Sequence, residues 1–155
     1  MHRAGPCAIL LFAFLFLCPA CGARRLYPGP ERPREEVVRL RPGTGSMDHR
    51  LSILEVDGRE IAIDAGELEV LPGRHTVLVR LTHEPRDAQW LQQDPLERSS
   101  ARYSNPARVT LEFESNPGRT YVVYGTIVDE NQPVAWITDR ETKKVIVEVR
   151  GAAAK

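Results

Sequence analysis

Histidines with acidic neighbours are the residues of this chain best suited to acid–base or metal chemistry. His83 is followed directly by Glu84 and, three positions later, by Asp87. Imidazole and carboxylate groups are common zinc ligands. His49, His75 and His83 belong to different predicted elements, without the close two-ligand spacing of a metal motif. A small hydrolase or metal-dependent enzyme using the region around His83 is therefore the alternative function, and solvated polar residues at a strand end explain the same pattern more simply.

Cysteine offers a second kind of chemistry. The chain begins with His2 and Arg3, followed by an apolar run over residues 9–17 and then by Cys21. This layout is typical of a removable export signal, because the run is too short to span a bilayer stably. We predict that residues 1–20 are a signal peptide. Two of the three cysteines lie within it, so no internal disulfide is expected in the mature protein.

The residues around Cys21 resemble the lipobox of bacterial lipoproteins, in which small residues precede a cysteine that becomes lipidated. Ala20 fits the cleavage position, and Cys18 stands where the family usually has leucine. The resemblance implies a diacylglyceryl group on Cys21, and two acyl chains anchor a protein stably. An ordinary secretory signal cleaved near Ala20 or Ala23 is the competing interpretation.

The residue after the cysteine bears on localisation. In lipoproteins of enteric-type bacteria, an aspartate at this position retains the protein at the inner membrane, and here it is Gly22. The resemblance therefore implies an outer-membrane anchor, with the protein facing the periplasm.

Aromatic side chains are candidates for contacts with a partner. Tyr121, Tyr124 and Trp136 lie in predicted strands, where an exposed row could stack against sugar rings, although burial in a small core is the common role of such residues. Trp90 lies in a long polar connection over residues 84–106 that could contain a helical turn. It would either cover an edge of the core or contact a partner.

The charge balance argues against nucleic-acid binding. The 155 residues contain 21 lysines and arginines and 21 aspartates and glutamates, so there is no overall basic field of the kind that attracts nucleic acid. From Cys21 to Arg50 the sequence contains seven arginines and four acidic residues. This local excess could lie against anionic lipid or cell-wall polymer, or could simply keep a spacer soluble.

Beyond Arg50 the hydrophobic pattern has a period of two, which indicates strands with one buried face. Asp57-Gly58 is a strong hairpin signal, and the residues from 121 to 128 are apolar on both sides, as suits a central strand. We predict an all-β fold, an antiparallel β-sandwich of about seven or eight strands. The alternating residues expected to face the core are Val77, Val79, Leu81, Val109, Leu111, Phe113, Val145, Val147 and Val149.

The prolines and glycines of the leader set the predicted domain boundaries. Residues 21–48 are rich in both and show little apolar periodicity, which predicts an extended tether carrying the lipidated cysteine. A first edge strand over residues 36–40 is the alternative for its most apolar stretch. The sandwich is expected over residues 49–150 and a disordered tail over residues 151–155.

A second resemblance covers about residues 53–81. The Val56-Asp57-Gly58 hairpin and the run Leu71-Pro72-Gly73-Arg74-His75 resemble PEGA-type modules, small sandwich-like domains of bacterial envelope proteins. The resemblance implies an envelope domain without assigning any functional residue.

Taken together, these patterns predict a non-enzymatic, lipid-anchored envelope protein that binds another envelope component, either a protein or a glycan such as peptidoglycan. No catalytic residue, cofactor or metal site is predicted. The candidate site residues are Cys21 for lipidation and Trp90, Tyr121, Tyr124 and Trp136 for partner contacts.

Overall fold

The computed structural model describes residues 23–43, 49–62, 65–83, 106–128 and 132–151. Over these residues the chain forms strands almost throughout, with one short 3-10 turn, η1 (Arg34–Glu36). The all-β prediction is confirmed. The strands of the described part are β1 (Arg24–Arg25), β2 (Val38–Pro42), β3 (His49–Val56), β4 (Arg59–Glu60), β5 (Leu68–Val70), β6 (Gly73–His83), β7 (Ala107–Ser115), β8 (Thr120–Val128), β9 (Gln132–Asp139) and β10 (Val145–Arg150).

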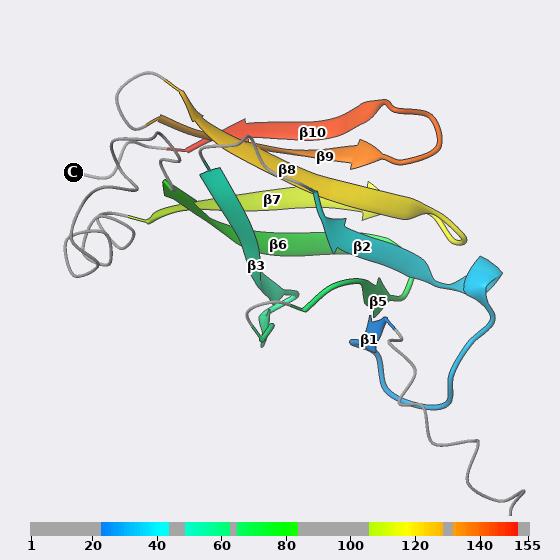
Figure 1. Cartoon of the computed structure of the whole chain (residues 1–155). Coiled ribbons are helices and arrows are strands. Elements are labelled where there is room, and N and C mark those ends of the chain that lie inside the picture. Colours follow the sequence, from blue (N-terminus) through cyan, green and yellow to red (C-terminus); the bar gives the residue numbers. More distant parts are fainter. Residues whose placement is uncertain (1–22, 44–48, 63–64, 84–105, 129–131, 152–155) are drawn as a thin grey trace, which may run out of the picture.

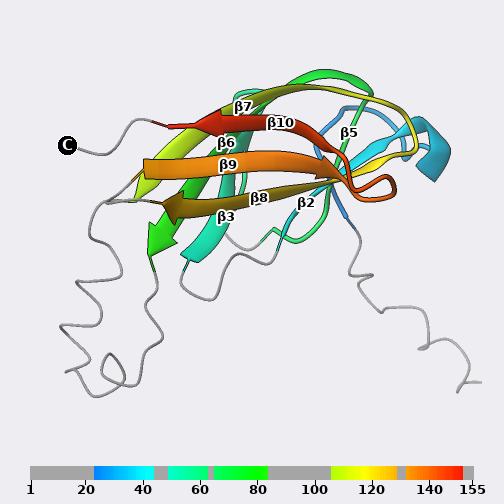
Figure 2. The ribbon, with the colours of Figure 1, turned by 90° about the horizontal axis from the view of Figure 1, so that it is seen from above.

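Two mostly antiparallel sheets form the sandwich. The larger sheet has the order β1-β5-β2-β8-β9-β10, and the smaller sheet has the order β4-β3-β6-β7. Figure 1 shows β8, β9 and β10 as one layer over β6 and β7. In Figure 2 the strands of one sheet run obliquely across those of the other, as expected for two twisted sheets packed face to face. The facing sides of the two sheets enclose the core.

Alternation along β6 and β7 decides which side chains enter this core. In β7 every second residue is buried and the residues between are exposed. β6 pairs with β7 residue by residue, so the buried positions of the two strands meet on the same face. The sequence predicted this face correctly. Its members are Val77, Val79, Leu81, Val109, Leu111 and Phe113.

β10 departs from the predicted alternation at its start. Val145 pairs with Thr138 but Val147 pairs with Ile137, so β10 carries one extra residue between them. Such a bulge rotates the strand locally. Val147 and Val149 pack against the core, whereas Val145 is 47% exposed. The prediction that Val145 faces the core with them is therefore wrong.

The leader belongs to the sandwich, and the prediction of a tether over residues 21–48 is wrong where the chain forms β1 and β2. β2 lies between β5 and β8 and runs parallel to β8, so it is an interior strand rather than an edge strand. Val38 and Leu40 are fully buried there and extend the core. The prolines that suggested a tether lie mainly between β1 and η1.

The Asp57–Gly58 turn joins β3 to β4 as the sequence predicted. Both residues have positive φ, 52° at Asp57 and 74° at Gly58, and Val56 pairs with Arg59 across the turn. A two-residue hairpin loop of this kind requires positive φ at both positions, which glycine adopts without strain. The turn fixes the register of this end of the smaller sheet.

Candidate functional site

Tyr124 and Trp136 lie side by side on the outer face of the larger sheet. They are direct partners in the antiparallel pair of β8 and β9. Their ring centroids are 5.7 Å apart and the ring planes are inclined by 19°. The neighbouring Val123 and Ala135 are fully buried in the core, so alternation turns both aromatic rings outward, where they are partly exposed. The strands thus hold a stacked aromatic pair on the outer face of the sheet.

A glycine makes room for the tyrosine ring. The N–H of Gly43 donates to the carbonyl of Val123 at 2.7 Å, which places Gly43 beside Tyr124. A Cβ atom at Gly43 would lie 2.4 Å from two ring carbons of Tyr124, a distance that no side chain tolerates. Only glycine fits this position without moving the ring. The backbone of Gly43 therefore forms one wall of the site.

A carboxylate lies on the other side of the pair. Glu148 of β10 is exposed and pairs with Trp136 across the ladder. We call Gly43, Tyr124, Trp136 and Glu148 the aromatic row. The sequence indicated the two aromatic residues, and the alternation of β10 could have indicated Glu148. No local signal indicated Gly43, because its contact with Tyr124 depends on the pairing of β2 with β8.

Two valines lie beside the aromatic row on the same outer face of the larger sheet. Val122 and Val134 are 6% and 7% exposed, yet neither belongs to the core cluster between the sheets. Val122 pairs with Thr138 and Val134 pairs with Thr126, so the two pairs flank Tyr124 and Trp136 along the strands. The outer face therefore has an apolar base bordered by hydroxyl groups.

Tyr121 does not belong to this surface. It is 2% exposed, and its ring meets Phe113 edge-on at 5.2 Å within the core. Its hydroxyl accepts a hydrogen bond from the N–H of Asn116 at 3.1 Å. It is three positions before Tyr124, so the two side chains leave opposite faces of β8. The candidate role of Tyr121 as a partner contact is therefore wrong, and the structure shows the core position that is the common role of such residues.

Cys21 and Trp90 lie outside the described residues, as do the signal segment, the long connection after His83 and the last four residues of the predicted tail. Among the residues that the structure describes, no helix is long and apolar enough to cross a membrane.

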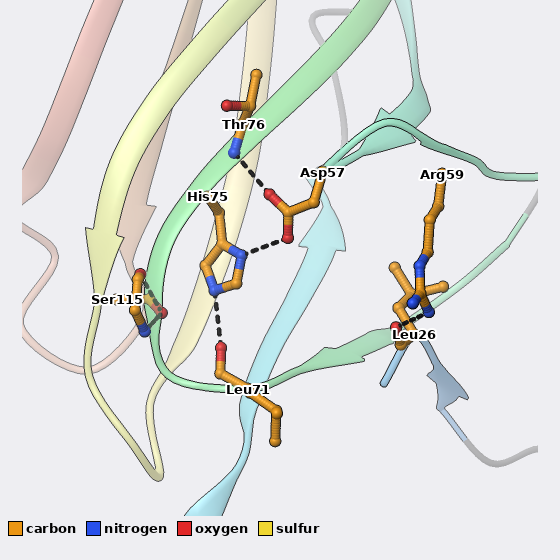
Figure 3. A network of polar contacts seen from close by, with 8 residues as sticks. Leu26, Asp57, Arg59, Leu71, His75, Thr76 and Ser115 are labelled. Carbon is orange, nitrogen blue, oxygen red and sulfur yellow. Dashed lines mark hydrogen bonds and ion pairs between the residues drawn. The ribbon is translucent and has the colours of Figure 1, made fainter. Parts of the chain in front are cut away.

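His75 holds the Asp57–Gly58 turn in place (Figure 3). Its Nδ1 lies 2.7 Å from Oδ2 of Asp57 and its Nε2 lies 2.8 Å from the carbonyl oxygen of Leu71. The other carboxylate oxygen of Asp57 accepts from the N–H of Thr76 at 2.9 Å. Because His75 is buried and both ring nitrogens already face oxygen atoms, its role is to join two segments rather than to bind a ligand.

His49 and His83 are cross-strand partners at the end of β3 and β6. They are 34 positions apart in the sequence, and only the strand register brings them together. Among the described residues, no group of three or more histidine, cysteine, aspartate and glutamate side chains could hold a metal ion. The side chain of His83 lies outside that description.

Asp139 organises the turn between β9 and β10. Its Oδ1 accepts from the N–H groups of Glu141 and Thr142, both at 2.9 Å. Burial alone would raise the pKa of Asp139, but these hydrogen bonds, together with the charge of Arg119, outweigh burial and lower the pKa. The carboxylate is thus a structural group that closes the turn.

Comparison with known proteins gives no family, since the chain matches no protein-family model, no curated protein and no solved structure.

Proposed function

We propose that this chain is a lipid-anchored protein of the bacterial cell envelope that binds an envelope glycan through the aromatic row. The observation that carries the proposal is the partly exposed, stacked pair of Tyr124 and Trp136 on the outer face of the larger sheet. An isolated surface aromatic needs no explanation, but two stacked rings held on adjacent central strands form a rigid apolar surface.

A sugar ring matches this surface in shape and polarity. Its C–H face is apolar and can lie on an aromatic ring, while its hydroxyl groups point sideways. Glu148, beside Trp136, has carboxylate oxygens that accept hydrogen bonds from such hydroxyls. The hydroxyls of Thr126 and Thr138 can donate or accept near the same rings. A protein partner that lays an apolar side chain on the rings is the competing occupant.

The anchor would hold this surface close to the membrane. Only Gly22 and Ala23 separate Cys21 from β1. Two or three residues extend at most about 10 Å, since each contributes roughly 3.3 to 3.6 Å. A lipid on Cys21 therefore places the sandwich next to the bilayer rather than on a long tether. With Gly22 after the cysteine, we propose the outer membrane and a periplasmic orientation.

Two experiments test the proposal separately. Membrane fractionation of wild type and Cys21→Ser tests the anchor, and unchanged fractionation of the variant contradicts lipidation. Sedimentation with purified peptidoglycan tests the aromatic row. We expect wild type to be retained, Trp136→Ala to be lost and Thr110→Ala, an exposed substitution on the smaller sheet, to behave as wild type. Absence of wild-type retention would exclude peptidoglycan as the ligand.

A metal-dependent enzyme is the second candidate, favoured by one observation. The register of β3 and β6 pairs His49 with His83, and two histidines are a common part of zinc sites. Metal analysis of the purified full chain, with His83→Ala as the control, decides this point. Stoichiometric metal that is lost in the variant would overturn the non-enzymatic proposal.

A further inference from the structure

Two arginines lie directly opposite each other on the outer face of the smaller sheet. Arg80 of β6 pairs with Arg108 of β7. The residues before and after Arg80, Val79 and Leu81, are fully buried, so alternation turns Arg80 to the outer face. Arg108 is exposed. Like charges at directly opposite positions repel each other, so this pair destabilises the sheet unless an anion lies between them.

Several other arginines of the described residues have acidic partners, and two of them are informative. Arg39 lies 3.1 Å from Glu67 and 3.3 Å from Glu69 on the larger sheet. Arg74, on the same face and strand as Arg80, contacts Glu112 at 2.5 Å. Within the described residues, neither Arg80 nor Arg108 forms an ion pair. The contrast with Arg74 shows that the face itself permits such pairing.

One nitrogen of Arg80 is also shielded from water. Its Nε is buried and has no hydrogen-bond partner. The Nε of Arg39 is in the same situation, but the two terminal nitrogens of Arg39 hold glutamates. Because this Nε is covered, the terminal N–H groups of Arg80 are the donors that an anion from solution would meet. Ser52 of β3 is the partner of Arg80 on its other side and adds a hydroxyl to the same row.

We infer that Arg80 and Arg108 bind a phosphate group. Each guanidinium presents a planar fork of N–H donors that matches two oxygens of an anion. A carboxylate has two oxygens and satisfies one fork, whereas a tetrahedral phosphate has enough oxygens for both. The group is either free phosphate or the phosphate ester of a lipid headgroup. This site is on the opposite sheet from the aromatic row, and its existence does not depend on glycan binding or lipidation.

Calorimetric titration of the full chain carrying Cys21→Ser with inorganic phosphate tests the inference, since this variant removes any effect of the anchor. We expect saturable binding that Arg108→Ala weakens by about tenfold or more, the usual effect of losing a charge-assisted hydrogen bond. Arg80→Lys keeps the charge but loses the fork and should also weaken binding. Arg74→Ala, on the same face, should leave binding unchanged. Thermal unfolding of each variant establishes that it is folded.

A second arm distinguishes the source of the phosphate. The same proteins are sedimented with vesicles of phosphatidylcholine alone and of equal parts phosphatidylcholine and phosphatidylglycerol. Binding to the anionic vesicles that requires Arg108 supports a lipid headgroup, and phosphate binding without vesicle binding supports a soluble ligand. Absence of both, equal binding by Arg108→Ala, or equal binding of acetate and phosphate overturns the inference.

Discussion

The two outer faces of the sandwich carry different side chains, although the two sheets share one core. On the larger sheet, Tyr124 and Trp136 form an aromatic surface over the buried Val122 and Val134. On the smaller sheet, the outer face is charged, as the pairing of Arg80 with Arg108 shows. The inner faces of both sheets are apolar and largely buried, because they determine the fold. The outer faces are free of that constraint, so their difference is the better indication of function.

The largest difference in stability is expected between substitutions on the inner and the outer face of β8. Tyr121→Ala removes an aromatic ring from the core and should lower the free energy of unfolding by about 3 to 5 kcal/mol. Tyr124→Ala removes a partly exposed ring and should cost about 1 kcal/mol, the typical effect of a mutation outside the core, while abolishing glycan retention. Urea denaturation measures both changes. Equal destabilisation by the two variants would contradict the assignment of Tyr124 to a binding surface.

The next effect tests the wall of the aromatic row. Gly43→Val forces a side chain into the Tyr124 ring and should destabilise the protein by about 1 to 3 kcal/mol, the usual cost of overpacking. Gly66→Val is a matched control, because a Cβ at Gly66 meets nothing within 4 Å. Chemical denaturation of both variants gives the comparison. A neutral Gly43→Val would mean that the ring does not rest on this glycine.

A smaller effect concerns the hairpin of the smaller sheet. His75→Ala removes the contacts to Asp57 and to the carbonyl of Leu71 and should cost about 1 to 2 kcal/mol, as expected for hydrogen bonds partly replaced by water. Thr76→Ala is the control, since Thr76 contributes its backbone N–H to Asp57 and keeps it in the variant. An unfolding temperature of His75→Ala equal to that of wild type would contradict the structural role of this histidine.

The smallest effect appears in the turn at the end of the larger sheet and depends on pH. Because the pKa of Asp139 is lowered on folding, the carboxylate stabilises the protein above the unfolded-state pKa of about 3.9. This contribution is lost as the pH falls through the folded-state pKa. Asp139→Asn should therefore be less stable than wild type at pH 7, with a difference that shrinks below about pH 4. Glu60→Gln, at an exposed position, should show no such trend.

Local pattern was sufficient to predict the core face of β6 and β7 and the Asp57–Gly58 turn, because alternation and positive φ are decided within a few residues. It failed at Val145, where the sequence alternates regularly but a bulge against β9 changes the register. It failed also at β2, because the prolines and glycines of the surrounding leader outweighed the two buried aliphatic residues of this strand.

The candidate site could be predicted only in part, because some of its contacts depend on how the strands pair. Tyr124 and Trp136 were visible as aromatic residues in strands, and alternation within β8 could already have separated Tyr124 from Tyr121. The contact of Gly43 with Tyr124 and the opposition of Arg80 and Arg108 join residues far apart in the chain. Such pairs are properties of strand order and register, which a single sequence does not specify.

The most direct measurement is the fluorescence of Trp136 during glycan binding. The chain has two tryptophans, so Trp90→Phe leaves Trp136 as the only one. Titration of this variant with soluble peptidoglycan fragments should produce a saturable change in emission, because the sugar would cover the indole ring. If the folded variant binds the fragments but its emission does not change, the glycan lies elsewhere on the protein, and the account is contradicted.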